Sequence, residues 1–334
     1  MKVLMIGHSG AGKTSFMAGM YKRLGEERSG YGMHTTDEEQ HMQLKRLADR
    51  LSRGQYPEGT DVQSSYLFNF TRNGKSIMPI EWIDYRGGAL TSTDKDDKEL
   101  KVLTDQIADS DALIIFLDGT KLNELRWETQ CEFDIIISCV ELALKKERKH
   151  WLPISMVITK ADLITVDDDL LKGLHYFDMF LENAQYSDVV KVSVSRCTVT
   201  QDDCESTIYP FLFAMDGILP NYIVQCREEE AVCKKEYKEQ SPCDLIEGIF
   251  FLAEQLLEWA FVIVSFILQK LLKWIFGINM NLWSWTTHFK WKYWKRQDWK
   301  EATRNRKHAE KRVKKVDKDI RKYIKKQKFK IYGK

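Results

Sequence analysis

GHSGAGKT, at residues 7–14, is the stretch that decides the fold. It fits the spacing G-x-x-x-x-G-K-[ST] of the phosphate-binding loop, and it lies between an apolar run at residues 2–6 and a helix-forming run that starts at Thr14. Glycines let the backbone N–H groups wrap around phosphate oxygens at the positive end of the helix dipole. This order of strand, glycine loop and helix predicts a bound nucleoside triphosphate.

The side chains of the loop have separate expected roles. Lys13 is expected to reach the β- and γ-phosphates, and the Thr14 hydroxyl is expected to hold Mg²⁺. His8 lies near the expected γ-phosphate; it is either a sensor of that phosphate or, in the favoured interpretation, a side chain that points outward. The other residues predicted to contact the nucleotide here are Gly7, Ser9, Gly10, Ala11, Gly12 and Ser15.

Apolar runs of strand length, separated by helical patterns, continue to about residue 220. The dipeptide Asn73-Gly74 between two such runs is the strongest short hairpin signal. Strands that alternate with helices give a parallel sheet with helices on both faces, so we expect an α/β P-loop NTPase domain, a three-layer sandwich. The expected strands are 2–6, 65–70, 76–83, 111–118, 153–160 and 189–195, and the expected helices start at 14 and cover 36 to about 53, 122–146 and 206–217.

Asp84 ends the second strand of the predicted hairpin, in WIDYRGG at residues 82–88. A carboxylate at the end of a buried strand, after a phosphate loop, is where a P-loop NTPase orders its magnesium ion. Residues 84–87 also read D-x-x-G. We therefore expect Asp84 to hold a water ligand of Mg²⁺.

Thr159-Lys160-Ala161-Asp162 follows the predicted strand 153–160. In this order after the phosphate loop and D-x-x-G, it resembles the N-K-x-D base box of Ras-like, translation-factor-related P-loop GTPases. The resemblance covers roughly residues 1–220. It is closest to bacterial GTPases of the double-GTPase type associated with conflict systems, through G-H-S-G-A-G-K-T, P-x-G-T at 57–60 and D-Y-R-G-G at 84–88. It implies GTP or GDP and Mg²⁺ as cofactors.

The resemblance also implies roles for single residues. Asp162 would accept hydrogen bonds from guanine N1–H and N2–H₂, and the stem of Lys160 would cover the base. Thr60 would close on Mg²⁺ and the γ-phosphate, acting with Lys13 in catalysis, and Gly87 would contact the nucleotide. The implied metal ligands are Thr14, Thr60 and Asp84, and the remaining implied nucleotide contacts are Thr159, Ser195 and Arg196.

Gly88 stands where Ras-type enzymes often place a glutamine that orients the attacking water. Glycine has no side chain for this task, so we expect a GTP-binding switch with slow hydrolysis. Arg53, Arg72 and Arg86 are conceivable donors of positive charge, although a solvated surface arginine is the simpler interpretation of each. Two alternatives stay open: an ATP-binding P-loop NTPase, if Thr159 marks a drifted base box, and a nucleotide-binding scaffold without turnover.

The C-terminal third of the chain changes in composition. Residues 244–285 are an apolar helical segment, expected either to lie in a membrane interface or to pack on the GTPase body. Residues 286–334 form a basic tail with aromatic and helical patterns, and residues 288–334 alone carry +15, which leaves −13 for the rest of a chain of net charge +2. The tail is expected to serve as an effector or membrane-docking part.

The expected partners beyond guanine nucleotide are therefore an anionic membrane surface, a protein effector and a second copy through the C-terminal helices. Nucleic acid fits the basic tail but is less favoured. The seven cysteines form no C-x-x-C pair, which favours reduced thiols. We expect a cytoplasmic protein, with peripheral binding at the inner face of the membrane as one option.

Overall fold

The computed structural model describes residues 1–26, 30–35, 37–57, 63–85, 97–122, 126–145, 151–164, 173–200, 205–238, 282–326 and 330–332. The chain divides into two compact units. The first combines Met1–Tyr222 with Arg312–Lys334, and the second is Ile223–Lys311.

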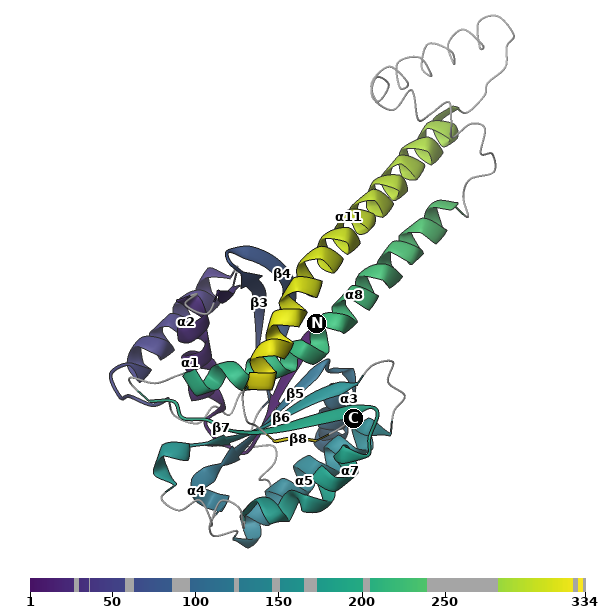
Figure 1. Cartoon of the computed structure of the whole chain (residues 1–334). Coiled ribbons are helices and arrows are strands. Elements are labelled where there is room, and N and C mark those ends of the chain that lie inside the picture. Colours follow the sequence, from purple (N-terminus) through teal and green to yellow (C-terminus); the bar gives the residue numbers. More distant parts are fainter. Residues whose placement is uncertain are drawn as a thin grey trace, which may run out of the picture. The chain divides into compact units, whose positions relative to one another are not determined.

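One eight-stranded sheet forms the first unit, in the order β2-β3-β4-β1-β5-β6-β7-β8 (Figure 1). The central strands β4, β1, β5, β6 and β7 are parallel, whereas β2, β3 and β8 are antiparallel to their neighbours at the two edges. The predicted parallel sheet is confirmed, and β2 and β8 extend it beyond the predicted strands. The strands are β1 Lys2–Ile6, β2 Tyr31–Thr35, β3 Ser64–Arg72, β4 Lys75–Asp84, β5 Ala112–Asp118, β6 Leu152–Thr159, β7 Val190–Arg196 and β8 Lys330–Tyr332.

Helices cover both faces of the sheet, which confirms the three-layer α/β architecture. The buried cluster on one face joins the sheet to α3, α5 and α7, through Leu103, Phe133 and Phe180. On the other face, Phe16 of α1 meets Phe116 edge-on at 5.0 Å, and Phe211 of α8 stacks on Trp82 at 6.1 Å. The helices are α1 Lys13–Gly25, α2 Glu38–Leu51, α3 Asp97–Asp109, α4 Gly119–Leu122, α5 Trp127–Leu144, α7 Asp178–Gln185, α8 Ile208–Lys238 and α11 Leu282–Lys326, with 3₁₀ turns at Ala161–Leu163, His175–Phe177 and Glu205–Thr207.

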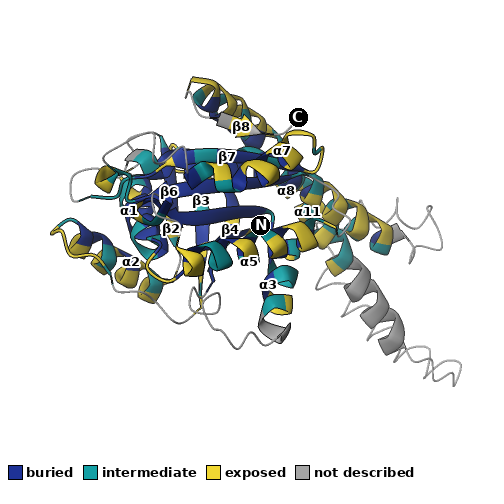
Figure 2. Ribbon diagram, turned by 90° about the horizontal axis from the view of Figure 1, so that it is seen from below, coloured by how far each residue is buried: buried dark blue, intermediate teal, exposed yellow. Residues whose placement is uncertain are grey.

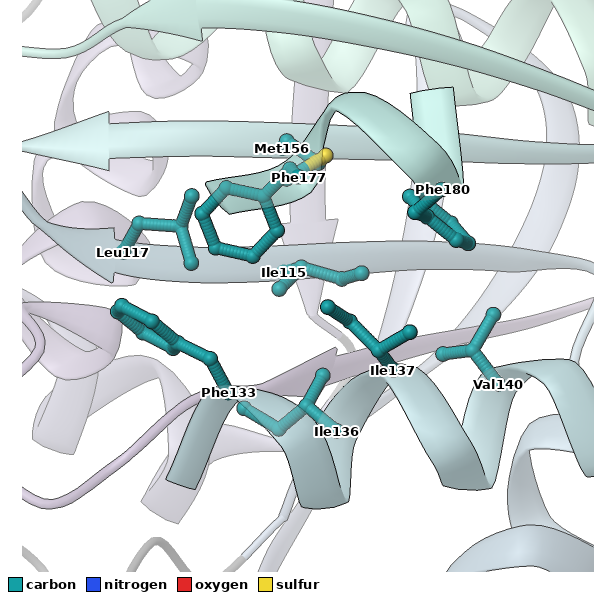
Figure 3. Close-up of a pocket in the computed structure, with 9 residues that line it drawn as sticks. All are labelled: Ile115, Leu117, Phe133, Ile136, Ile137, Val140, Met156, Phe177 and Phe180. Atoms are coloured by element: carbon teal, nitrogen blue, oxygen red, sulfur yellow. The ribbon is translucent and has the colours of Figure 1, made fainter. Parts of the chain in front are cut away.

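The central strands β1, β5 and β6 are almost fully buried between these layers (Figure 2). A small pocket lies between the sheet and helices α5 and α7, and Figure 3 shows the side chains that line it. All of them are apolar, so the pocket offers no group that could bind a phosphate or a base. They are Ile115, Leu117, Phe133, Ile136, Ile137, Val140, Met156, Phe177 and Phe180.

Local signals place the hairpin and the second helix where the sequence predicts them. Asn73 and Gly74, with φ of 48° and 70°, form the turn between β3 and β4, since a two-residue hairpin turn of this type needs left-handed residues. Asp37 caps α2 by accepting hydrogen bonds from the backbone N–H of Glu39 (2.9 Å) and Gln40 (3.1 Å). The last helix of the predicted domain is longer than expected, because α8 continues through Pro220 to Lys238.

The end of the chain packs in the first unit. Val313, Val316, Ile320 and Ile324, on one face of α11, are all buried. Beyond the helix, β8 pairs antiparallel with β7 and places Ile331 opposite Ser193. The predicted division into 1–220, 244–285 and 286–334 stays a prediction, and these contacts add that residues 312–334 belong with the sheet.

The second unit contains one segment each of α8 and α11, which run antiparallel. Its ion pairs join Arg227 to Glu310 at 2.8 Å and Arg306 to Glu230. The predicted apolar segment 244–285 lies outside the described residues up to residue 281, and nothing beyond its helical backbone is described for 282–285. Across the described part of the chain, no helix is both long and apolar enough to span a bilayer.

Candidate nucleotide-binding site

The phosphate loop connects β1 to α1, and two of its glycines are required by their surroundings. A Cβ atom on Gly7 would lie 2.8 Å from the backbone oxygen of Phe116, so only glycine lets the loop approach β5 this closely. Gly12 has a left-handed φ of 86°, and its added Cβ would lie 3.4 Å from Thr159. Gly12 is also the N-cap of α1 and makes no side-chain cap. The loop is therefore shaped as a backbone cradle at a helix N-terminus, the arrangement that binds phosphate.

Lys13 extends across this loop. Its Nζ donates hydrogen bonds to the backbone oxygens of Gly7 (2.9 Å) and His8 (3.2 Å), and the side chain is buried. Burial lowers the pKa of the Lys13 ammonium, and the nearby Asp84 carboxylate opposes that shift. A buried cation whose described hydrogen bonds go to carbonyl oxygens alone is well suited to an incoming anion.

Asp84 lies beside the loop at the end of β4, in register with Met5 of β1. It is buried, and its Oδ1 has no hydrogen-bond partner among the described residues. Burial raises the pKa of the Asp84 carboxyl to about 6, although Lys13 draws it down. Such a carboxylate oxygen needs a cation or a water to complete its surroundings.

The residues at this position fit Mg²⁺. The ion prefers oxygen ligands and keeps several waters, with one or two carboxylates and the phosphates of the substrate. Asp84 supplies the carboxylate, and the half-buried Thr14 lies in the first turn of α1, next to Lys13. A cluster of three or more His, Cys, Asp or Glu side chains is absent from the described residues, and a nucleotide-bound Mg²⁺ does not need one.

The base box is tied to the phosphate loop by Thr159, the residue that departs from the N-K-x-D pattern. Its hydroxyl donates to the backbone oxygen of Ala11 at 2.8 Å and has that of Leu117 as a second acceptor at 3.1 Å. The side chain is buried. Threonine in place of asparagine therefore still makes a direct link between the two loops.

Asp162 follows on the 3₁₀ turn Ala161–Leu163 and is exposed. The turn is joined to the loop after β7, because the backbone N–H of Ala161 donates to the oxygen of Cys197 at 3.3 Å. The N–H of Cys197 in turn donates to the oxygen of Ile158 at 2.7 Å. The structure thus brings together the two loops that the sequence assigns to the base.

The contact between these loops is made by the backbone of Cys197, the last residue of Ser195-Arg196-Cys197, a stretch that resembles the family's S-A-K box in position only. Of the two predicted residues beside it, Ser195 is buried with a hydroxyl that has no hydrogen-bond partner in the described part of the chain, and Arg196 is exposed. The position of the loop matches the prediction, and its signal in the sequence was the end of a strand rather than any side chain.

His8 corrects an expectation. It is 1% exposed, not outward-pointing, and its Nδ1 donates to the backbone oxygen of Ser9 at 2.8 Å. Burial lowers the pKa of its imidazole, and Lys121, Asp118 and Lys13 are close enough to affect it. Its Nε2 meets no hydrogen-bond partner among the residues described.

Asp118 is the main functional candidate that sequence reasoning missed. It ends β5, is buried, and its Oδ2 accepts a hydrogen bond from Lys160 Nζ at 2.6 Å. A carboxylate at the carboxyl end of the apolar run DALIIFLD was the available signal, the same one that drew attention to Asp84.

The structure also limits the predicted catalytic groups. Thr60, Arg86, Gly87 and Gly88 lie outside the described residues. Arg53 is exposed.

Arg72 is not available as a charge donor. Its guanidinium pairs with Asp319 and lies over the ring of Tyr31 at 5.5 Å. It also lies at the hairpin turn, whereas Asp84 lies at the opposite end of β4, about 30 Å away at the usual rise of a strand.

Comparison with known proteins agrees with this geometry. Residues 4–159 match the family model described as Double-GTPase 1. This match supports a P-loop GTPase of the double-GTPase type over that part of the chain. The match begins in β1 and ends at Thr159, so it contains the phosphate loop and Asp84, and the similarity supports GTP as the ligand. The resemblance found in the sequence is confirmed. Comparison with curated proteins gives no match.

Solved structures similar to this chain include the complex "SRb-GTP/SRX" of the signal recognition particle receptor from Chaetomium thermophilum, at 15% identity and a TM-score of 0.39, over 64% of this chain and 96% of that one. The GDP form of the same receptor subunit matches at 14% identity and a TM-score of 0.33, over 64% and 97%. A point mutant of NFeoB from S. thermophilus, bound to GDP, matches at 13% identity and a TM-score of 0.31, over 64% and 60%.

Proposed function

We propose that this protein is a GTP-binding switch that hydrolyses GTP slowly with Mg²⁺ and docks through its C-terminal region. Two buried charged groups carry the proposal. Among the bonds described, Lys13 donates only to carbonyl oxygens of its own loop. Asp84 has an oxygen, Oδ1, without a hydrogen-bond partner in the described part of the chain. Both groups sit beside a helix N-terminus without a side-chain cap. A triphosphate and its cation supply what each group lacks.

In the bound state, Lys13 exchanges its two carbonyl contacts for β- and γ-phosphate oxygens and neutralises their charge. The N–H groups of the loop and the first turn of α1 bind the remaining phosphate oxygens. Mg²⁺ would be held by Thr14, Thr60 and a water on Asp84, and it would neutralise charge on the β- and γ-phosphates. Lys13 and Thr60 are the proposed catalytic residues.

Base selection rests on Asp162. Its carboxylate can accept from guanine N1–H and N2–H₂ together, and adenine lacks this pair of donors. The link from Thr159 to Ala11 supports an intact base box, so GTP is favoured over the alternative of ATP. Titration of the protein with GTP and with ATP in the presence of Mg²⁺ tests the choice: tighter ATP binding contradicts the proposal.

Slow hydrolysis follows from Gly88, which cannot orient a water molecule. The alternative, a scaffold that binds nucleotide without turnover, shares this feature. The two differ in phosphate release over many turnovers, which the switch shows and the scaffold does not.

The proposed docking part is the basic face of α11. Exposed cations recur every three or four residues, the spacing that places them on one side of a helix. An anionic membrane surface suits such a face, since each basic residue near it adds roughly 1 kcal/mol of attraction. Sedimentation with anionic vesicles, weakened by salt, is the expected result; a protein effector or a second copy is the outcome if none sediments. These cations are Lys300, Arg304, Lys307 and Lys311 in the second unit and Lys314, Lys318, Lys322 and Lys325 in the first.

A further inference from the structure

The position and hydrogen bonds of Asp118 suit a residue that fixes the base box relative to the phosphate loop. It is 2% exposed and lies directly opposite Thr159 in the pairing of β5 with β6. One oxygen, Oδ1, accepts from the backbone N–H of Thr120 (3.0 Å) and from its hydroxyl (2.7 Å). The other, Oδ2, accepts from Lys160 at 2.6 Å. Both oxygens of the carboxylate are therefore committed.

The charge state of Asp118 agrees with this commitment. Burial by itself would raise the pKa of the carboxyl, but the hydrogen bonds from Lys160 and Thr120 outweigh it and hold the pKa below its usual range. The group is ionised at neutral pH and presents a full charge to Lys160.

Lys160 needs such a partner. Its backbone is left-handed, with φ of 54°, and the only other non-glycine residue with positive φ in the described part of the chain is Asn73 in the hairpin turn. Asparagine tolerates this conformation and lysine gains nothing from it, so the backbone of Lys160 carries a cost that its ion pair offsets. The next residues are the 3₁₀ turn that carries Asp162, so the conformation of Lys160 sets where the turn begins.

Close packing at the next residue, Gly119, fixes the position of Asp118. A Cβ on the following residue, Gly119, would lie 2.7 Å from the backbone oxygen of Thr159 and 2.5 Å from Ile164. The end of β5 is therefore packed directly against the base box, and it also meets Gly7 of the phosphate loop at Phe116.

We infer that Asp118 is a positioning residue for guanine recognition, which acts by holding Lys160 and, through it, the base box beside the phosphate loop. Asp118 does not itself contact the nucleotide. The inference rests on the proposed guanine site and adds to it a residue outside the family's base-box pattern.

The test uses Asp118→Asn in the full chain, because asparagine keeps an oxygen for Thr120 and replaces the oxygen that accepts from Lys160 with an NH₂ donor, so both the charge and the hydrogen bond to Lys160 are lost. GDP affinity, measured by calorimetry with Mg²⁺, is expected to fall about tenfold, the equivalent of 1.4 kcal/mol. Affinity for tripolyphosphate, which has no base, is expected to stay within about twofold, since the phosphate loop is untouched. Lys160→Met keeps the stem over the base and should lose as much GDP affinity as Asp118→Asn, with no further loss in the double variant.

Asp216→Asn is the matched control. Asp216 also pairs with a cation, Arg321 at 3.1 Å, but it lies at the other end of the sheet, where the neighbouring Gly217 packs on Pro153 near the start of β6. This variant should bind GDP as the parent does.

Three results overturn the inference in a parent chain that binds GDP: unchanged GDP affinity, additive losses from the two single variants, or an equal loss of tripolyphosphate binding. If Asp118→Asn does not fold, Lys160→Arg is compared with Lys160→Met. Arginine can rebuild the pair and should retain most of the affinity, and equal losses would refute the role of Asp118. A parent chain that binds no GDP refutes the proposed function first, and this inference with it.

Discussion

Replacing Asp84 with asparagine should stabilise the nucleotide-free protein at neutral pH while weakening Mg²⁺-dependent nucleotide binding. The carboxyl is buried, its Oδ1 has no partner among the described residues, and its pKa is raised to about 6 from an ordinary value of 3.8. At about 1.4 kcal/mol per pKa unit, ionising this group costs the folded state up to about 3 kcal/mol. The loss of attraction to Lys13 reduces the gain from the substitution.

The sign of the effect is fixed by linkage. The folded protein holds the proton more tightly than the unfolded chain, so its free energy of unfolding falls as pH rises from about 4 to about 6 and this contribution is then constant. The asparagine of the variant would not titrate. The two proteins should therefore unfold at similar urea concentrations near pH 4 and diverge by pH 7.5, with the variant more stable.

Urea denaturation without nucleotide or Mg²⁺ measures this difference directly. Asp37→Asn is the control, since asparagine caps a helix as well as aspartate does and should change stability little. If Asp84→Asn is no more stable than the parent at pH 7.5, burial does not destabilise the carboxylate, and Asp84 has no need of a cation beside it.

The site and the fold lead to four further predictions. Lys13→Ala should nearly abolish triphosphate binding in a calorimetric titration, and binding like the parent's would remove the phosphate loop from the site. Asp162→Asn should weaken GTP and favour xanthosine triphosphate, whose O2 gains a donor; unchanged GTP affinity would contradict its role. Thr159→Val leaves the oxygens of Ala11 and Leu117 without their donor, so the free energy of unfolding should fall by about 1–3 kcal/mol and nucleotide affinity should fall with it, and an unchanged affinity would refute the link. Single-turnover hydrolysis by the parent should run at or below roughly 10⁻⁴ to 10⁻² per second, and a faster rate would reveal another water-orienting group.

The sequence was sufficient for those parts of the fold whose signals are local. The glycines of residues 7–12 and the turn at Asn73-Gly74 each dictate a backbone shape within a few residues. The buried strands at the centre of the sheet are continuous apolar runs, and such runs can be recognised without knowing which strands lie beside them. These elements place Lys13, Asp84 and Thr159 at the carboxyl ends of the central parallel strands β1, β4 and β6.

Elements that depend on distant partners were not predictable in this way. The strand β2 is only YGMHT, with a glycine and no alternating pattern, and β8 is three residues at the end of a basic tail. β8 owes its conformation to β7, more than a hundred residues earlier, and no local propensity specifies that pairing. His8 is likewise buried near Asp118 and Lys121, residues distant in sequence that the phosphate-loop motif does not include.

The C-terminal tail has a structural role that its charge does not predict. Charge alone describes residues 312–334 as a surface for an anionic partner, yet one face of this helix buries Val313, Val316 and Ile320. Arg312 donates to the backbone oxygen of Ser76 at 2.6 Å, at the end of the hairpin opposite Asp84. β8 then pairs with β7. The strand β7 ends at Arg196, directly before Cys197 and the base loop. The tail therefore both exposes its lysines and completes the sheet, so a GTPase domain cut at residue 243 would lose an edge strand and the cover of an apolar surface.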